Sequence, residues 1–262
     1  EEKTIFTNIF FDKNKFSSET SFRINYFSRY GYLPQFGQKF VFKPKFNIET
    51  FANISKIYRV PSYTELFYWD PNHQSSEDLK IEQTINYSLG AGFKINQNIG
   101  FSLAGSYCEP INAIDWARES GTSRWKVTNI AKVETYVLDF RFNFNYKFIN
   151  SKLMYTFVNK KFDLPQNIEL KYINNYPTNS LSFLLFLPPV IGFETSINNI
   201  YKKYTKTQPE EFFITNFTIS KKIFKNTEVI LNIENLFDNK YEEIPGIQQS
   251  PQRILLKLYT TF

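Results

Sequence analysis

The chain has 262 residues, which is enough for one large all-β domain or two small ones. Its aromatic content is 19%, with 29 phenylalanines, yet its mean hydropathy of -0.37 is polar. This combination fits strands that are apolar on one face only, and it does not fit transmembrane helices, because the most apolar run, 181–193, is short and contains two prolines. The net charge of +6 comes from scattered lysines and arginines, which argues against nucleic-acid binding.

The sequence contains one cysteine, Cys108, and one histidine, His73. These counts exclude an internal disulfide, a multi-cysteine metal site and a histidine-cluster metal site. The acidic residues are separated from one another and have no histidine or nucleophile context that would support acid–base catalysis. We therefore predict that the chain is not an enzyme, and that it has no catalytic residues, no metal and no cofactor.

Alternation of apolar and polar residues with period two dominates the sequence. In the stretch 136–146, six apolar side chains alternate with Val137 and with four charged or amide side chains. Strands of soluble sandwiches average five or six residues, whereas about ten alternating residues cross a bilayer when the strand is tilted. The alternation therefore predicts an all-β, antiparallel transmembrane β-barrel meander.

The same pattern predicts about thirteen strands, at residues 4–11, 18–27, 35–42, 48–58, 81–95, 99–116, 129–148, 152–162, 181–187, 190–203, 212–223, 227–237 and 253–262. Short connections are expected at 43–46, 96–98, 149–151, 188–189 and 224–226, and long ones at 59–80, 117–128, 163–179, 204–211 and 238–252. Short turns at one edge and long loops at the other are typical of outer-membrane barrels. Single-chain bacterial barrels have even strand numbers, so an odd count is unexpected for a whole barrel. Because the chain also begins in mid-meander, we expect residues 1–262 to be the C-terminal portion of a larger barrel.

Three segments resemble segments of the TonB-dependent outer-membrane receptors. The first is 51–67, FANISKIYRVPSYTELF, whose Arg-x-Pro-Ser-x-x-Glu-Leu pattern contains Arg59, Pro61 and Glu65. An Asp-Leu-Lys-Ile-Glu run follows at 78–82, where the family has proline in place of Ile81. We expect Arg59 and Glu65 to pair and to hold the following loop.

The second segment, 129–140, matches the family at an asparagine and a lysine but lacks its glycine and glutamate. The third is the most specific: it contains Asn235, Phe237 and Tyr241, followed by Arg253 and a terminal Phe262. The family's Pro-Gly-Arg reads Pro-Gln-Arg at 251–253. The likeness thus runs in order from residue 51 to the end of the chain.

The resemblance implies a barrel of about 22 strands around a plug domain, with the plug and the first strands absent from this sequence. It also implies energy-coupled uptake of a scarce, bulky nutrient such as a ferric siderophore, cobalamin or haem. The expected partners are outer-membrane lipid, the missing N-terminal barrel and plug portion, TonB through that plug, and the barrel-assembly machinery through the C-terminal strand. A passive porin-like or structural barrel, an adhesin and a soluble β protein are the alternatives.

Aromatic and basic residues in or beside the long loops are candidates for ligand contact, because such side chains are good anchors. They are Tyr63, Tyr68, Trp69, His73, Arg118, Arg124 and Trp125. The alternative for the aromatic residues is the interfacial girdle, where tryptophan and tyrosine rest at headgroup level. That alternative is favoured for Trp116, and an exposed loop position is favoured for His73.

Overall fold

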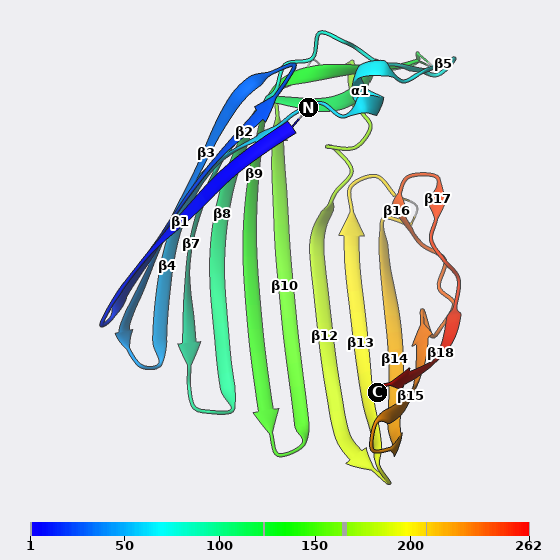
Figure 1. Ribbon diagram of the computed structural model, residues 1–262. Coiled ribbons are helices and arrows are strands. Elements are labelled where there is room, and N and C mark those ends of the chain that lie inside the picture. Colours follow the sequence, from blue (N-terminus) through cyan, green and yellow to red (C-terminus); the bar gives the residue numbers. More distant parts are fainter. Residues whose placement is uncertain (1, 123, 164–166, 208, 262) are drawn as a thin grey trace. The chain divides into compact units, whose positions relative to one another are not determined.

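The computed structural model describes residues 2–122, 124–163, 167–207 and 209–261 (Figure 1). The chain divides into two compact units. Unit 1 comprises Glu1–Ala91, Ala104–Leu138 and Val158–Asn174, and unit 2 comprises Gly92–Leu103, Asp139–Phe157 and Asn175–Phe262. Four long strands have one end in each unit: β7 (Glu82–Lys94), β8 (Ile99–Glu119), β9 (Trp125–Tyr146) and β10 (Ile149–Phe162).

Unit 1 is an antiparallel meander in which consecutive long strands pair. Its first strands are β1 (Glu2–Lys13), β2 (Phe16–Phe27), β3 (Gly31–Lys45) and β4 (Ile48–Arg59), and the order continues through β7, β8, β9 and β10. Among the described strands, β1 pairs with β2 alone, over twelve residue pairs from Glu2 with Phe27 to Lys13 with Phe16. β1 is therefore an edge strand of this unit.

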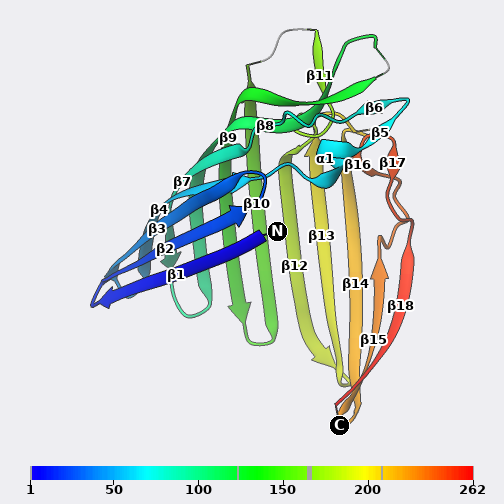
Figure 2. The ribbon, with the colours of Figure 1, turned by 45° about the horizontal axis from the view of Figure 1, so that its top comes forward.

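Small elements gather at one end of unit 1, which we call its loop end. Helix α1 (Tyr63–Phe67) and the hairpin β5 (Trp69–Asp70) and β6 (His73–Gln74) lie between β4 and β7 in sequence. β6 pairs in parallel with β9, and β11 (Ile168–Leu170) pairs with β8, so three connections meet there (Figure 2). No helix of the described residues is long and apolar enough to cross a membrane.

Unit 2 continues the alternation of long antiparallel strands. Its further strands are β12 (Pro177–Val190), β13 (Phe193–Tyr204), β14 (Glu211–Phe224), β15 (Thr227–Glu234) and β18 (Arg253–Thr260). A small hairpin, β16 (Glu242–Ile244) and β17 (Ile247–Gln248), fills the connection between β15 and β18. In the part that the structure describes, β18 pairs with β15 alone and is the edge strand of this unit.

The thirteen predicted strands are confirmed by β1–β4, β7–β10, β12–β15 and β18. The predicted turn at 188–189 is wrong: both prolines lie in β12, and the chain reverses at Ile191 and Gly192, which have φ of 53° and 75°. The pairing of β12 with β13 shifts register between Leu187 and Val190. Such an irregularity accommodates prolines, because they have no N–H to donate to the ladder.

Three other connections also differ from the prediction. Residues 43–45 belong to β3, and that turn falls at 46–47. Residues 149–151 belong to β10, and the turn falls two residues earlier, with Lys147 at φ 52°. The expected loop at 117–128 is largely strand, because β8 extends to Glu119 and β9 begins at Trp125. Both extensions have backbone partners outside the meander: β11 pairs with the end of β8, and β6 pairs with the start of β9. These partners satisfy the backbone groups of the extended strands.

Within unit 1, buried side chains are concentrated at the loop end rather than along the sheet. One cluster contains Leu66, Leu79, Ile114, Trp116 and Val127. A second contains Ala113, Ile130, Val133 and Leu170. Trp116 is 7% exposed, so its predicted place in an interfacial girdle is wrong. The loop end is therefore a packed structure that can hold side chains in fixed positions.

Candidate ligand-binding site

Arg59 connects the end of β4 to α1 and to two further strands. Its Nη1 lies 3.1 Å from both carboxylate oxygens of Glu65, and its Nη2 lies 3.0 Å from Oε2 of Glu82. Nη2 also donates to the carbonyl oxygen of Ile114 at 3.1 Å. The predicted pairing of Arg59 with Glu65 is thus confirmed, and Arg59 also reaches β7 and β8.

A capping box begins α1 and explains how so short a helix forms. The backbone N–H of Ser62 donates to Oε2 of Glu65 at 2.7 Å, and the backbone N–H of Glu65 donates to the Ser62 hydroxyl at 3.3 Å. Each bond satisfies a donor that the first helical turn leaves unpaired. Pro61, directly before Ser62, is buried. The Arg-x-Pro-Ser-x-x-Glu pattern therefore fixes the entry to the loop end.

Asp70 organises the β5–β6 hairpin. Its carboxylate accepts hydrogen bonds from the Tyr68 hydroxyl at 2.8 Å and from the backbone N–H groups of Asn72 and His73, both at 2.6 Å. The His73 ring contacts the same carboxylate through Nδ1 at 3.0 Å. Burial alone would raise the pKa of Asp70, but these donors together outweigh burial and lower its pKa to about 2. The hydrogen bond to Asp70 raises the pKa of the Tyr68 hydroxyl.

His73 is held on three sides. Besides Asp70, its Nε2 lies 2.8 Å from Nζ of Lys171, and its ring packs edge-on against Trp116 with centroids 5.1 Å apart. Its side chain is 22% exposed, so the expected exposed loop position is wrong. His73 acts here as a link between the hairpin, β8 and the segment after β11.

Two arginines stack on two tryptophans beside this hairpin. The guanidinium carbon of Arg118 lies 4.4 Å from the Trp125 ring centroid, and that of Arg124 lies 5.6 Å from the Trp69 ring centroid. Arg118 also forms an ion pair with Glu169 at 2.8 Å. These contacts hold both guanidinium groups in place. A planar guanidinium can stack on a tryptophan ring and still offer N–H donors at its edge.

A cavity of about 540 Å³ lies between these elements. Its charged lining consists of Arg118, Arg124 and Lys126, with Glu119 as the one acidic residue among the described lining residues. The Nε of Arg124 is buried and has no hydrogen-bond partner within the described part of the chain. The cavity therefore offers positive charge and donors, which suits an anionic ligand. No group of three or more potential metal-ligating side chains occurs in the described residues.

The family model described as TonB dependent receptor-like, beta-barrel matches residues 7–236. The chain belongs to this family. The expectation that it is not an enzyme is confirmed by this membership, because the family is one of receptors. Membership also implies an outer-membrane setting. A comparison with curated proteins gave no match.

Solved structures of receptors and transporters share the fold of this receptor chain. The siderophore receptor PirA from Acinetobacter baumannii is 12% identical with a TM-score of 0.75, and a mutant of the ferric enterobactin receptor PfeA from Pseudomonas aeruginosa is 11% identical with a TM-score of 0.74. The copper transporter OprC is 13% identical with a TM-score of 0.77. Each comparison covers 100% of the receptor chain but only 45%, 45% and 48% of these structures, respectively.

The structure brings some of the predicted ligand residues of this receptor chain together and leaves others apart. Arg118 and Arg124 line the cavity, with Trp125 and Trp69 as their stacking partners. Tyr63 instead packs on Phe67 and is 79% exposed. Tyr68 and His73 are engaged with Asp70, as described above.

Lys126 and Gln74 also line the cavity, although neither was predicted from the sequence. Residues 125–128 alternate apolar and polar as Trp-Lys-Val-Thr, and this alternation is the signal that would have extended the predicted strand to include Lys126. For Gln74 the sequence carries no signal, because its place depends on the pairing of β6 with β9.

The C-terminal motif of the receptor chain has a structural role in unit 2. Asn235 is 3% exposed; its side chain accepts from the Asn239 backbone N–H at 3.0 Å and donates to the Asn239 carbonyl at 2.9 Å. Tyr241 packs on Phe212 with ring centroids 4.5 Å apart, and Arg253 pairs with Glu234 at 2.5 Å. Phe237 is 65% exposed, and Phe262 lies outside the described residues.

Proposed function

We propose that this chain supplies barrel wall and extracellular loops to an outer-membrane receptor for TonB-dependent uptake of a scarce, bulky nutrient. The observation that carries the proposal is the cavity at the loop end. Its lining carries Arg124 and Lys126 against one carboxylate, Glu119, while its third positive charge, Arg118, is paired with Glu169. Ferric siderophores, haem and cobalamin are the candidate nutrients. The positive lining favours an anionic chelate, and a ferric siderophore fits that chemistry.

The proposed cycle has two steps. The loop end first captures the nutrient, and TonB then moves a plug so that the nutrient passes the barrel. A plug would be contributed by other parts of the protein, and the coverage of less than half of each solved structure supports this division. Residues 1–262 are accordingly proposed to be the C-terminal portion of a larger barrel.

Tryptophan fluorescence tests the capture step in the protein purified from outer membranes. Trp69 and Trp125 stack on the arginines of the cavity, so an iron chelate bound there should quench them. We expect ferric enterobactin, haemin or cyanocobalamin, used as probes, to give saturable quenching. Arg124→Gln and Lys126→Gln should each raise Kd by roughly ten- to hundredfold, since one charge-assisted hydrogen bond is worth about 1.5–3 kcal/mol.

Lys43→Gln is the matched control for Lys126→Gln, because Lys43 also has an exposed side chain and lies near the opposite end of unit 1. Equal Kd values for these two variants would exclude the cavity as the capture site.

Uptake of the quenching probe by whole cells then separates energy-coupled transport from passage through a passive barrel. Uptake abolished by a proton-motive-force uncoupler supports coupling to TonB, whereas uptake that persists supports a porin-like barrel.

A further inference from the structure

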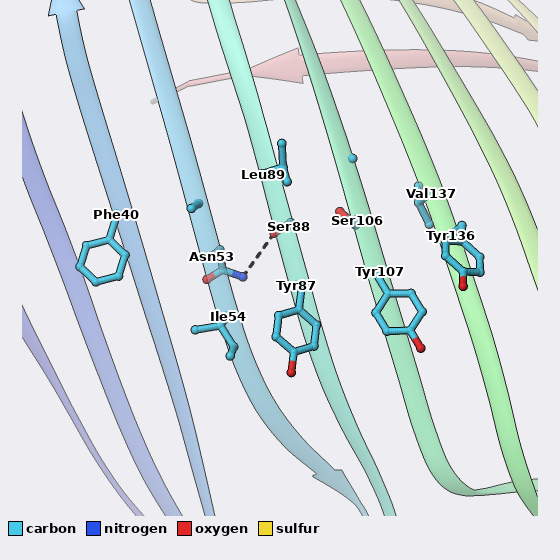
Figure 3. Close-up of a pocket in the computed structure, with 12 residues that line it drawn as sticks. Phe40, Asn53, Ile54, Tyr87, Ser88, Leu89, Ser106, Tyr107, Tyr136 and Val137 are labelled. Carbon is cyan, nitrogen blue, oxygen red and sulfur yellow. Dashed lines mark hydrogen bonds between the residues drawn. The ribbon is translucent and has the colours of Figure 1, made fainter.

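Two hollows of unit 1 differ in the charge of their lining. Figure 3 shows one of about 600 Å³, between β3 and β9, where Tyr87, Tyr107 and Tyr136 lie side by side on neighbouring strands; none of its described lining residues is charged. The other is the cavity at the loop end, which has four charged residues in its described lining. Of these two, the loop-end cavity is the one whose affinity for an ionic ligand a neighbouring proton can change.

His73 lies directly beside the lining of the loop-end cavity. The next residue, Gln74, is a lining residue, and it lies opposite the lining residue Lys126 where β6 pairs with β9. In the same pairing His73 lies opposite Trp125. The Trp125 ring stacks on Arg118, whose guanidinium carbon is 4.4 Å from the ring centroid. His73 is therefore one residue away from the cavity wall on its own strand and opposite the stacking partner of a cavity arginine.

The contacts of the His73 ring fix which nitrogen carries its hydrogen. Nζ of Lys171 lies 2.8 Å from Nε2, and an ammonium group donates hydrogen bonds but accepts none, so Nε2 must be the acceptor. Nδ1 lies 3.0 Å from Oδ2 of Asp70, which accepts the ring hydrogen. Although burial alone would raise the pKa of Asp70, its hydrogen-bond donors lower it to about 2, so the carboxylate stays ionised wherever histidine titrates. The arrangement therefore requires a neutral imidazole with its hydrogen on Nδ1.

The side chain of Lys171 can move while its backbone is held. The Lys171 N–H donates to the Trp116 carbonyl oxygen at 2.9 Å, and the next two backbone N–H groups donate to the carboxylate of Asp115 at 3.1 Å and 2.8 Å. Besides contacting His73, the ammonium lies 5.8 Å from the ring centroid of Trp125. Loss of the contact with His73 would leave the ammonium beside Trp125, the ring that also stacks on the cavity arginine.

Protonation of His73 breaks its contact with Lys171. An imidazolium has a hydrogen on both nitrogens, so its Nε2–H would face an ammonium that has the same charge and no acceptor. Asp70 favours the protonated ring, whereas Lys171 opposes it. Lys171 is therefore the group whose position depends on the charge of His73. The other charged or titratable groups on the elements packed against His73 have partners of their own or face the cavity: Tyr68, Asp115, Arg118, Glu169, Arg124 and Lys126.

We infer that His73 is a positioning residue of the loop-end cavity: its neutral ring holds the Lys171 ammonium, and its protonation releases that ammonium to an anionic ligand. The inference rests on the proposed capture of an anionic nutrient and names how that capture is regulated. Protonation adds one positive charge and frees a second, and a bound anion stabilises both. The affinity for an anionic ligand should therefore rise as the pH falls from about 8 to about 5.5, a range in which histidine side chains commonly change charge.

Nitrogen-15 NMR of the purified protein, labelled at histidine, tests the holding step without any ligand. His73 is the only histidine in residues 1–262, and its signals are identified by their loss in His73→Gln. At pH 8 the ring should carry its hydrogen on Nδ1. A hydrogen on Nε2 would overturn the inference, because Lys171 could not then donate to that nitrogen.

Tryptophan quenching by ferric enterobactin or haemin, used as anionic probes, measures the effect on capture at pH 8 and pH 5.5. His73→Gln is the comparison, because its amide oxygen can still accept a hydrogen bond from Lys171 but does not titrate. Titration of the probe itself is common to both proteins. Relative to His73→Gln, the wild type should bind roughly fivefold more tightly at the lower pH, the effect of one partly exposed charge pair. An equal pH dependence of Kd in the two proteins would contradict the role assigned to His73.

Lys171→Gln should lose most of this gain at low pH, because it removes the ammonium that protonation releases. Lys56→Gln is the matched control and should keep the full gain: Lys56 is also partly buried and lies over an aromatic ring, 5.3 Å from the Tyr58 centroid, but it belongs to β4. Equal losses in the two lysine variants would also overturn the inference. Circular dichroism checks that each variant folds, and His73→Asn replaces His73→Gln if that variant does not fold.

The two measurements separate failure of this inference from failure of the proposed uptake function. If neither probe quenches the wild type at either pH, the capture function is wrong and His73 has no role in it, while the nitrogen signals still report whether His73 holds Lys171. If a probe binds but the ring hydrogen is on Nε2, capture stands and the positioning role of His73 is wrong.

Discussion

Arg59 and Glu65 are six residues apart in the sequence and form an ion pair, in which both carboxylate oxygens of Glu65 lie 3.1 Å from Nη1 of Arg59. The pair joins the last residue of β4 to the only helix in the described residues, and the same arginine reaches Glu82 on β7. The guanidinium of Arg59 donates to two carboxylates and one carbonyl oxygen, which belong to α1, β7 and β8. Because the donors of a guanidinium have a fixed planar arrangement, these bonds hold the three segments in fixed positions. The loop end is thus attached to the sheet at the residue where β4 ends.

A double-mutant cycle measures what this attachment contributes to the loop end. Arg59→Gln and Glu65→Gln should each lower the local opening free energy of residues 60–81 by about 1–2 kcal/mol, more than an isolated surface pair contributes and less than a fully buried one. The measurement is native-state hydrogen exchange of that segment. The double variant should cost less than the sum of the single variants, since the two side chains share the interaction. Strictly additive effects would show that the pair contributes nothing.

The acidity of Asp70 predicts a pH dependence of the β5–β6 hairpin. Its pKa is lowered to about 2, below the usual value, because the donors of Tyr68, Asn72 and His73 stabilise the carboxylate more than burial disfavours it. A depressed carboxylate pKa stabilises the folded state above the unfolded pKa, and that contribution is lost as the pH falls toward 2. A carbon-13 NMR titration of the aspartate carboxyls, assigned with Asp70→Asn, should give a midpoint near 2. A midpoint near 4 would contradict the hydrogen-bond network.

The sequence predicted the strands well and the loop end incompletely, for a physical reason. Strand alternation is local, so every long strand from β1 to β18 could be located from period two alone. The position of Arg118 relative to Trp125 depends on the pairing of β11 with β8 and of β6 with β9, which joins residues that are far apart in the sequence. Local patterns carry no information on such pairings. The Arg59–Glu65 contact was predictable because both residues belong to one contiguous motif.

The turn between β12 and β13 offers a stabilising substitution. Ile191 has φ of 53°, a left-handed conformation that is costly for a β-branched residue, by roughly 1–2 kcal/mol. Ile191→Asn should therefore raise the free energy of unfolding by about 1 kcal/mol, since asparagine followed by glycine favours this hairpin turn. Val190→Asn, one residue earlier in the strand, is the control and should give no gain. The measurement is urea unfolding from lipid vesicles; equal effects of the two variants would contradict the turn assignment.

Phe142 and Asn143 are neighbours in β9 whose side chains point to opposite faces of the sheet. If Phe142 faces lipid near the bilayer middle, Phe142→Arg should cost about 2–4 kcal/mol, whereas Asn143→Arg on the polar face should cost little. The two variants introduce the same side chain one residue apart, so each serves as the control for the other. Folding yield and unfolding in lipid vesicles are the measurements. Similar costs for both variants would show that the assigned faces are wrong.

The outer edge of β1 predicts how the chain behaves by itself. All residues of this twelve-residue strand are exposed, among them Ile9 at 63% and Phe10 at 70%, and its pairing in the described residues is with β2 alone. Unpaired N–H and C=O groups along such an edge are a template for another strand, and in lipid they have no water to satisfy them. The isolated chain should therefore associate through β1 in detergent micelles, as measured by size-exclusion chromatography with light scattering.

A charge on the edge strand should weaken that association, because lysine is one of the residues that protect natural edges. Ile9→Lys is expected to shift the chain toward the monomer, and Leu138→Lys, on the interior strand β9 and 42% exposed, is expected to leave the oligomer intact. Addition of a polypeptide that supplies the neighbouring strand of the barrel should have the same effect as Ile9→Lys, because it satisfies the same backbone groups. A wild-type chain that is monomeric and whose β1 amides are all protected from hydrogen exchange would show that this edge is satisfied within the chain, and the prediction of an open edge would be wrong.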